Sequence, residues 1–500
     1  MKYNCLCFLF PILIFSQNVD SSFSQEKMRK DLKIFKSIRI QANSGIYKYR
    51  TKKEMDSIYS WADTEISKSS NYRQFYNIIS FITDFEGSLH NDTYLSKNSN
   101  KKLRSEKYGY FPFPIKLVEG RWIINMKNKD LPLGSELLYI NDEKIDYIIQ
   151  KLYKYYTTDG YNITGKQIGI NTHFSKYYRL NNGLNNSFKV VYKEYGSDKT
   201  KCKIIKGIGY MDYYQNFKNR FSKPFDDKYY KKLKNDEKYS FKIINSKIGV
   251  LTINTFSLGD NSNSIEHLKY KSFLDSTFLF IKENKINDLI VDIRNNGGGT
   301  DPNDILTYSY LAKKDFSENK SAWISFNKIP LLRYYNSKLP VILRPLFVNK
   351  YNKIFHRKFP DYIDGKFYEN ENSEDHKLWK PNDNAFTGKI YLLINPAVAS
   401  AASLFASLVT NNSNAVIIGE ETMGGYYGHN GHTEMEYKLP NSKIITSFSI
   451  VNLEQDVSPK KKQIYGRGIM PDYNVSQSYK DYLNQKDTQF NFTLDLIQHQ

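Results

Sequence analysis

The sequence predicts an α/β protein with a mostly parallel sheet in its C-terminal half, a helical region at its N-terminus and a small β-rich domain between them. From about residue 247 onward, short strands alternate with helical segments, and this βαβ order is typical of parallel sheets. Between about residues 24 and 82, apolar residues recur at helical spacing. Between about residues 108 and 205, short apolar runs alternate with turn residues, which indicates β-structure.

The composition excludes several classes of protein. The chain has 500 residues, of which 40% are hydrophobic and 25% charged, so it can bury a large core and is not a low-complexity or mostly disordered chain. The net charge is +20, but the lysines are spread along the whole chain. Because they form no stripe, we expect no nucleic-acid partner.

The N-terminus predicts export. Lys2 precedes an apolar run from Cys5 to Phe15, and Ser16 provides a small residue at a cleavage point. We therefore expect residues 1–16 to be a signal peptide that directs the protein to the periplasm or out of the cell. The run is shorter than the roughly 20 residues of a transmembrane helix, and no later segment is apolar enough to cross a membrane.

Four further parts follow from the patterns: a helical region at 17–102, the β-rich domain at 103–205, a connecting segment at 206–246 and the parallel-sheet core at 247–500. The helical region is indicated by Met28, Leu32, Phe35, Ile38, Met55, Ile58, Trp61, Ile66, Phe75, Ile78 and Ile79. Strands of the β-rich domain are expected at 115–118, 122–124, 137–140 and 188–191. In the core, strands are expected at 248–253, 289–293, 390–394 and 415–418, and helices at 262–283, 302–313 and 399–410.

The first segment with chemical potential is D-I-R-N-N-G-G-G at residues 292–299, which follows a buried strand and precedes a helix. Three glycines allow the backbone to approach a ligand closely and to turn its N–H groups outward. This suits an anion or oxyanion site, although a tight loop without a ligand explains it equally well. The segment matches neither a dinucleotide nor a Walker motif.

The second segment is N-P-A-V-A-S-A-A-S at residues 395–403, where a strand ends and a helix of small residues begins near Ser400. A serine at this position is often only a helix cap. The same position places its hydroxyl beside free N–H groups at the positive end of the helix dipole, where the oxyanion of acyl transfer would be stabilised. The sequence is not G-x-S-x-G, which disfavours an α/β-hydrolase.

Two more segments are rich in glycine and polar residues. One is G-E-E-T-M-G-G at residues 419–425, followed by a loop with His429 and His432. The other is D-F-E-G-S-L-H-N-D-T at residues 84–93, in which His90 lies in a polar turn. Loops carry function disproportionately, but each histidine is as readily explained as a solvent-exposed loop residue.

The segments at 292–299, 395–403 and 419–425, taken in order and followed by G-I-M-P-D at residues 468–472, resemble the tail-specific (C-terminal processing) serine peptidase family, in particular its tricorn-core-like branch. The resemblance runs from about residue 247 to 472. It implies a ClpP/crotonase-like α/β core, and residues 133–148 resemble the PDZ-like module of many members. The implied nucleophile is Ser400, and the implied oxyanion donors are the N–H groups of Ala401 and Gly298.

The general base differs from that of many family members, which use a lysine where this chain has Gly425. Glycine cannot accept a proton, so a serine–lysine dyad at that position is excluded. The tricorn-like branch uses an upstream histidine, and G-S-L-H at residues 87–90 resembles that segment, so we expect His90 to be the base. His429 and His432 are alternative bases; their spacing could also suggest a metal, but no third ligand is evident, and we expect neither metal nor cofactor.

A third catalytic residue should orient the base. Glu454 and Asp456 are candidates, since they follow an expected strand at 444–450 at a distance from Ser400 that the resemblance implies. We therefore expect an exported serine endopeptidase that acts on polypeptides; the oligomeric state has no indicator in the sequence. The alternative is a catalytically inactive ligand- or peptide-binding protein on the same scaffold, which the absent lysine motivates.

Overall fold

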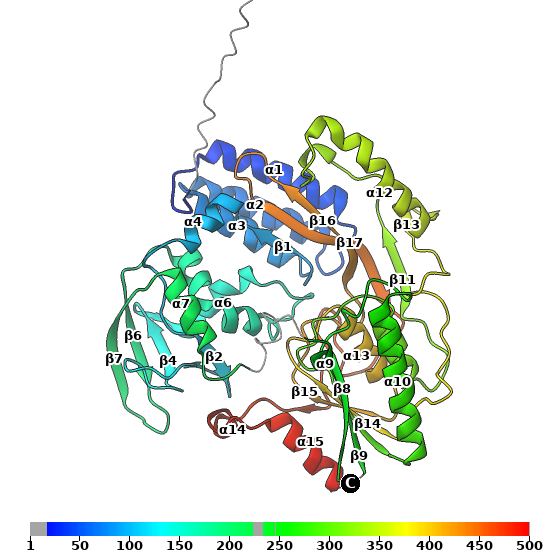
Figure 1. Ribbon diagram of the computed structural model, residues 1–500. Coiled ribbons are helices and arrows are strands. Elements are labelled where there is room, and N and C mark those ends of the chain that lie inside the picture. Colours follow the sequence, from blue (N-terminus) through cyan, green and yellow to red (C-terminus); the bar gives the residue numbers. More distant parts are fainter. Residues whose placement is uncertain (1–17, 224–233, 246, 500) are drawn as a thin grey trace, which may run out of the picture.

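The computed structural model describes residues 18–223, 234–245 and 247–499, so the expected signal peptide at 1–16 lies outside the described residues. The described chain is a mixed α/β fold with three sheets of six strands each. In Figure 1, one sheet lies beneath the N-terminal helices, the second forms the C-terminal lower part, and the third lies to the side with the segment coloured cyan to green.

The lower sheet is the predicted, mostly parallel one. Its strand order is β18–β15–β14–β10–β9–β8, and only β8 and β9 pair antiparallel. The predicted core strands are confirmed to within about a residue at their ends. The bounds are β8 Tyr239–Ile244, β9 Ile248–Ile253, β10 Asp288–Asp292, β14 Lys389–Ile394, β15 Ala415–Gly419 and β18 Tyr473–Asn474.

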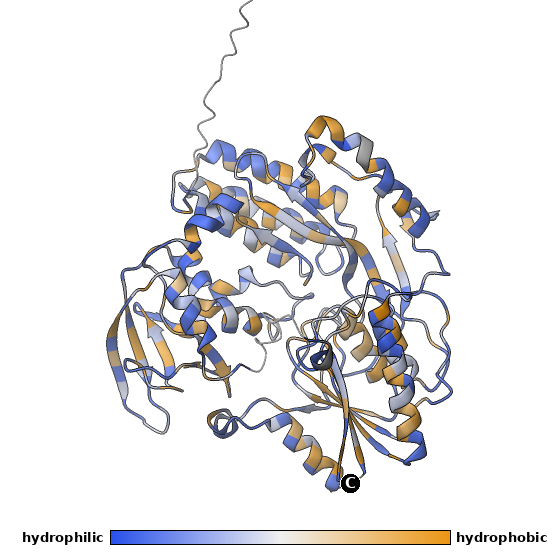
Figure 2. Ribbon diagram, in the orientation of Figure 1, coloured by the Kyte–Doolittle hydropathy of each residue, from blue (hydrophilic) through white to orange (hydrophobic). Residues whose placement is uncertain are grey.

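Helices cover both faces of this sheet. Side chains of α10 (Ile265–Glu283), α11 (Asn303–Ser309) and α13 (Ala401–Asn411) share one hydrophobic cluster with β9, β10 and β14. Side chains of α15 (Thr488–Gln498) pack on the opposite face. Figure 2 shows hydrophobic and hydrophilic residues intermixed along α10, as expected for a helix with one face on a sheet. The predicted helix at 302–313 is shorter than expected.

The upper sheet was not predicted as a sheet, although a strand at 444–450, nearly all of which is part of β17 (Ile445–Gln455), was expected. The sheet joins β1 (Asp92–Tyr94) to β17, followed by β11 (Asn319–Ile324), β13 (Lys366–Tyr368) and β12 (Asp361–Ile363), with β16 (Asn430–Lys438) also paired to β17. The predicted helical region is confirmed as α1 (Gln25–Ala42), α2 (Lys52–Ser67) and α3 (Tyr72–Phe85), which pack on this sheet together with α12 (Arg344–Lys358). Strand β17 was expected to end near residue 450, but it continues to Gln455 and so includes Glu454.

The side sheet contains the strands predicted for the β-rich domain, in the order β2–β3–β4–β6–β7 with β5 paired to β4. The long helix α6 (Lys166–Asn182) was not predicted here; it is buried on most of its circumference, so its sequence lacks a polar face. The remaining bounds are β2 Ile115–Val118, β3 Arg121–Ile124, β4 Glu136–Ile140, β5 Glu143–Lys144, β6 Ser187–Lys193, β7 Thr200–Lys206, α4 Lys97–Arg104, α5 Ile145–Leu152, α7 Tyr210–Lys218, α9 Asn235–Lys238 and α14 Tyr479–Asn484.

Two further observations on the described residues concern membranes and cysteine. Within the described ranges, none of the helices combines the length and the hydropathy that crossing a bilayer requires. Cys202 is an exposed free thiol on β7.

Candidate active site

Ser400 lies at the turn between the parallel strand β14 and helix α13. Its backbone has φ 52° and ψ −134°, a conformation that residues with a side chain rarely adopt and that costs roughly 1–3 kcal/mol. Its side chain accepts no capping hydrogen bond from the helix. A serine that served only as a helix cap would accept one, so the geometry indicates a hydroxyl held for another purpose.

The glycine loop after β10 packs directly against this turn. Gly298 has φ +100°, and a Cβ added to it would lie 2.8 Å from the Cβ of Ser400 and 3.0 Å from the amide nitrogen of Ala401. Only glycine therefore fits at this position. The loop is also tied to the turn through Asn296, whose carbonyl oxygen accepts from the N–H of Ala399 at 3.3 Å.

The two predicted oxyanion donors are placed differently. The N–H of Ala401, the first residue of α13, has no acceptor among the described residues. The N–H of Gly298 donates to Oδ1 of Asn296 at 2.9 Å. The Ala401 group is thus available to a ligand, whereas a ligand would compete with Asn296 for the Gly298 group.

The segment that carries glycine in place of the family lysine lies against the serine turn. The carbonyl oxygen of Val398 accepts from the N–H groups of Met423 and Gly424 at 3.1 and 3.2 Å. The next residue, Gly425, donates its N–H to Oδ2 of Asp159 at 3.0 Å.

Asp159 connects this segment to the turn that carries His90. Its other oxygen, Oδ1, accepts from the N–H of Leu89 at 3.0 Å. The carboxylate is fully buried, and burial raises its pKa to about 6 despite the two N–H donors. Asp159 therefore holds the His90 turn and the Gly425 segment together, and through Gly424 it links both to the serine turn.

Other buried polar contacts fix the same turn. The carboxylate of Glu86 pairs with the guanidinium of Arg39 from α1 and accepts from Nδ2 of Asn91 at 2.7 Å. The hydroxyl of Thr157 donates to the carbonyl oxygen of Asn91 at 2.7 Å. Beyond the turn, β1 pairs antiparallel with β17, so His90 is connected to the same sheet that carries the loop of His429.

The imidazole of His90 is oriented with its two nitrogens in different environments. Nδ1 lies 3.8 Å from Oε1 of Glu434 on β16. Nε2 is buried and has no hydrogen-bond partner among the described residues. A carboxylate on the Nδ1 side favours the tautomer with the proton on Nδ1, which leaves Nε2 with a free lone pair, as a general base requires.

The two alternative bases occupy less suitable positions. His429 is 2% exposed, its ring centroid is 5.5 Å from that of His90, and burial lowers its pKa well below the ordinary value, which makes it a weak base. His432 points away into a group of carboxylates, with Nδ1 3.5 Å from Oδ2 of Asp301 and Nε2 3.6 Å from Oδ2 of Asp375.

The structure does not bring the expected third residues to His90. Glu454 lies within β17 with an exposed side chain that pairs with Lys320 at 2.9 Å. Asp456 is also exposed, and neither carboxylate contacts His90 among the described residues. The carboxylate beside the imidazole is that of Glu434, which sequence reasoning missed.

Asp159, Glu86 and Glu434 are the residues around His90 that the sequence analysis did not identify. Asp159 lies in T-T-D-G, an ordinary turn sequence, and Glu434 lies on an alternating strand. Their positions depend on contacts between distant segments. Of the three, Glu86 alone lies in a segment that the sequence analysis singled out, the polar stretch at residues 84–93 that contains His90.

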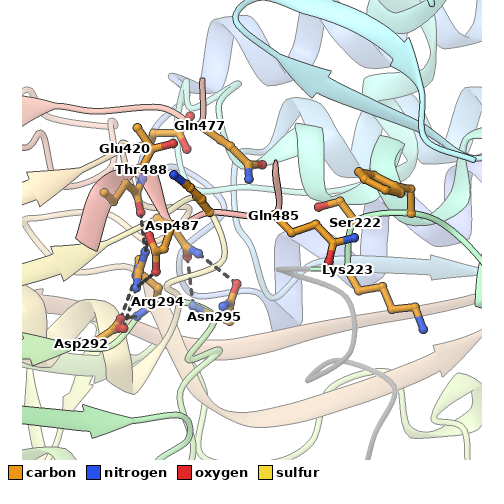
Figure 3. A pocket seen from close by; sticks show the side chains of 14 residues that line it. Ser222, Lys223, Asp292, Arg294, Asn295, Glu420, Gln477, Gln485, Asp487 and Thr488 are labelled. Carbon is orange, nitrogen blue, oxygen red and sulfur yellow. Dashed lines mark hydrogen bonds and ion pairs between the residues drawn. The ribbon is translucent and has the colours of Figure 1, made fainter. Parts of the chain in front are cut away.

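A pocket of about 530 Å³ opens at the carboxyl ends of β10, β14 and β15. Figure 3 shows Arg294 between Asp292 and Asp487, to both of which it is paired, with Glu420 nearby. Neither Ser400 nor His90 is among its described lining residues. The pocket therefore adjoins the glycine loop without including the serine and histidine.

Comparisons with known proteins identify a family for the C-terminal half of the chain. Residues 247–475 match the model of peptidase family S41. A carboxyl-terminal-processing protease of Synechocystis sp. is 28% identical over 120 residues, which cover 23% of this chain. The match spans 26% of that relative, or about a quarter of its length.

Two solved structures share the fold over nearly the whole chain. Mature CPAF complexed with lactacystin has a TM-score of 0.57 at 13% identity and covers 95% of this chain and 97% of its own. Mature CPAF has a TM-score of 0.56 at 12% identity and covers 92% of this chain and 94% of its own. The motifs, the βαβ core and the family match agree, and residues 247–475 thus form a peptidase family S41 domain.

Proposed function

We propose that this protein is a serine endopeptidase of the tail-specific type. The observation that carries the proposal is the conformation of Ser400, an uncapped serine at φ 52° whose turn is packed against a glycine with no room for a Cβ. Strained backbone that the surroundings hold in place is found preferentially at functional sites. The S41 domain around it supports peptide-bond hydrolysis as the reaction.

In the proposed mechanism, the hydroxyl oxygen of Ser400 attacks the peptide carbonyl, and Nε2 of His90 takes its proton. His90 then gives this proton to the leaving amine, and water hydrolyses the acyl-enzyme in a second, equivalent cycle. The N–H groups of Ala401 and Gly298 stabilise the tetrahedral oxyanion. The Gly298 group leaves Asn296 to do so, and Glu434 orients the imidazole.

The domain organisation around the site supports a polypeptide as substrate. We propose that residues 103–205 form a PDZ-like domain that binds an unstructured substrate segment by adding it to a sheet edge. The edge strands of that sheet are β2 and β7. Residues 157–160, at the inner side of this domain, hold the His90 turn, so substrate binding there would be communicated directly to the base.

We propose further that residues 1–16 are a signal peptide and that the enzyme acts in the periplasm or outside the cell. The test is the N-terminal sequence of the protein recovered from those compartments of a producing strain. A mature N-terminus near Gln17 is expected. Recovery of uncleaved protein from the cytoplasm alone would refute export without affecting the proposed chemistry.

The second candidate function is a non-catalytic binding protein, favoured by the glycine at position 425 and by the engagement of the Gly298 N–H with Asn296. A fluorophosphonate probe, which reacts only with an activated serine, separates the two. We expect the purified protein to be labelled, Ser400→Ala to be unlabelled, and His90→Ala to be labelled at least 100-fold more slowly.

Matched controls are available on exposed surface. Ser413→Ala, just beyond α13, and His356→Ala, on α12, should label at the wild-type rate. A folded wild type that resists the probe would indicate the binding protein. Labelling that persists in His90→Ala but is lost in His429→Ala would transfer the base to His429.

A further inference from the structure

Five carboxylates gather beside the glycine loop, outside the catalytic groups: Asp301, Asp304, Glu318, Glu369 and Asp375. They come from the end of the loop, from α11, from the segment before β11 and from the segment after β13. Glu369, Asp375, Glu318 and Asp304 are buried, the last two with no exposed surface. Carboxylates at such depth require cations, protons or hydrogen-bond donors.

The cations available to this group are few. Nζ of Lys358 lies 3.2 Å from Glu369 and 3.7 Å from Asp375. The two neighbouring histidines, His376 and His432, have pKa values that burial lowers, so they tend to be neutral. One lysine therefore faces five carboxylates among the described residues.

Lys358 serves one side of the group and leaves the other without a cation. On the far side, Asp301, Asp304 and Glu318 place one carboxylate oxygen each within 4.8 Å of one another. Among the described residues, no lysine, arginine or histidine pairs with Asp304 or Glu318, and no other side chain donates a hydrogen bond to them; the two carboxyl groups lie beside each other. Two fully buried carboxylates thus lie together with Asp301 and have no cationic partner.

We propose that Asp301, Asp304 and Glu318 bind a divalent cation of the calcium type. Three carboxylate oxygens are a hard ligand set, and Ca²⁺ binds oxygens at about 2.3–2.6 Å, so opposite ligands lie up to about 5 Å apart. Ca²⁺ accepts such oxygens in a flexible geometry, whereas Mg²⁺ requires near-ideal octahedral ligands at about 2.0–2.1 Å and usually keeps several waters, so an all-carboxylate group favours Ca²⁺. The proposed ligands do not include His429 or His432, for which no metal was expected, although Nδ1 of His432 lies 3.5 Å from Oδ2 of Asp301.

The position of the site gives the cation a function. Asp301 lies three residues after Gly298, Asp304 belongs to α11, and the backbone oxygen of Glu318 accepts from the N–H of Asp456 at 2.9 Å. A cation on the three carboxylates would fasten the loop that packs against Ser400 to α11 and to the segment preceding β11. The inference concerns binding and does not depend on the proposed peptidase activity.

The test uses the full-length mature protein after EDTA treatment. At pH 7.5 we expect one Ca²⁺ per chain by isothermal titration calorimetry and a rise of a few degrees in the melting temperature at saturating Ca²⁺. Mg²⁺ should give a smaller rise. Wild-type protein that binds no Ca²⁺ and whose melting temperature is unchanged would overturn the proposal and indicate carboxyl groups that share protons instead.

Isosteric variants locate the site. Asp304→Asn and Glu318→Gln each remove a ligand charge, so affinity should fall at least tenfold; because they also remove repulsion, both should melt higher than the wild type in EDTA. Asp315→Asn, an exposed neighbour, should bind as the wild type does. Wild-type affinity in both ligand variants, or loss of binding only in His432→Ala, would overturn the assignment. Should a variant fail to fold, the wild-type titration decides.

Discussion

The serine turn, residues 395–401, and the histidine turn, residues 86–91, are held by different kinds of contact. The serine turn is fixed within the S41 domain, mainly by backbone hydrogen bonds and by close packing against Gly298. The histidine turn is fixed by side chains from three other parts of the chain: the buried Arg39 and Asp159 and the exposed Glu434. The proposed nucleophile is thus held by one domain, whereas the position of the proposed base depends on several parts of the chain.

This difference has a mechanistic consequence. A turn made by backbone geometry keeps its shape as long as its own domain is folded. A turn held by charged side chains from other segments responds to changes in those segments, in pH and in domain contacts. Variants that loosen the histidine turn should therefore reduce activity while the S41 domain stays folded.

The largest effect is expected at the buried Arg39–Glu86 pair. Glu86→Gln leaves the guanidinium of Arg39, which has no exposed surface, without a counter-charge, and breaking such a pair costs about 3–5 kcal/mol. Urea unfolding should show this loss for the N-terminal part of the chain. Glu65→Gln, which breaks an exposed pair with Lys68, should cost at most about 1 kcal/mol. Equal losses in the two variants would mean that the pair does not support the histidine turn.

The serine turn should respond to a change of a single methyl group. In Gly298→Ala the new Cβ would lie 2.8 Å from the Cβ of Ser400 at a φ of +100°, so the oxyanion donors are displaced. We expect kcat to fall by about 10²–10³-fold, the effect of losing one such donor. Gly297→Ala is the matched control, because nothing lies within 4 Å of its added Cβ. A wild-type rate for Gly298→Ala would show that the loop takes no part in catalysis.

The two turns also differ in how much of their surroundings the sequence predicts. The strands of the lower sheet, the start of α13 and the packing partner Gly298 are encoded in short contiguous segments, so βαβ periodicity and the family resemblance identified them. Helix α6 and the upper sheet escaped notice because their burial is set by tertiary contacts and not by a local pattern. Strand β17 was expected to end before Asn452, although it continues to Gln455.

The base itself could be proposed from sequence, but its support could not. His90 was identified through a polar turn and a resemblance. Its neighbours Asp159 and Glu434 lie about 70 and 340 residues further along the chain, and no periodicity links them to it. The stretch with Glu454 and Asp456 had a suitable sequence distance from Ser400, yet both side chains point to solvent. Sequence separation does not determine which carboxylate meets an imidazole.

An intermediate effect is expected at Asp159, whose pKa of about 6 lies above its value of about 4 in the unfolded chain. Between these values the folded state binds more protons, so the contribution of this group to stability is full below about pH 4 and is lost as the pH rises to 6. The change amounts to roughly 2–3 kcal/mol. Asp159→Asn should remove it, as urea unfolding at pH 4 to 7 would show.

Asp159→Asn should also affect the reaction. The amide offers one oxygen to two N–H donors, those of Leu89 and Gly425, so one of them loses its acceptor and the histidine turn loosens. We expect fluorophosphonate labelling to slow about tenfold at pH 7.5. Asp198→Asn, at an exposed site in the same domain, serves as the control. An unchanged labelling rate would mean that the position of His90 does not depend on this connection.

The smallest effect distinguishes two carboxylates. Glu434 is exposed, and its Oε1 lies 3.8 Å from Nδ1 of His90; a hydrogen bond from His90 holds the pKa of Glu434 below its ordinary value. Glu434→Gln removes a partly solvated ion pair worth at most about 1 kcal/mol, so kcat/KM should fall two- to fivefold. Glu454→Gln should leave kcat/KM unchanged, because Glu454 pairs with Lys320 on the surface. The opposite ranking would assign the third catalytic role to the carboxylate that the sequence suggested, and β17 would then have to shift when substrate binds.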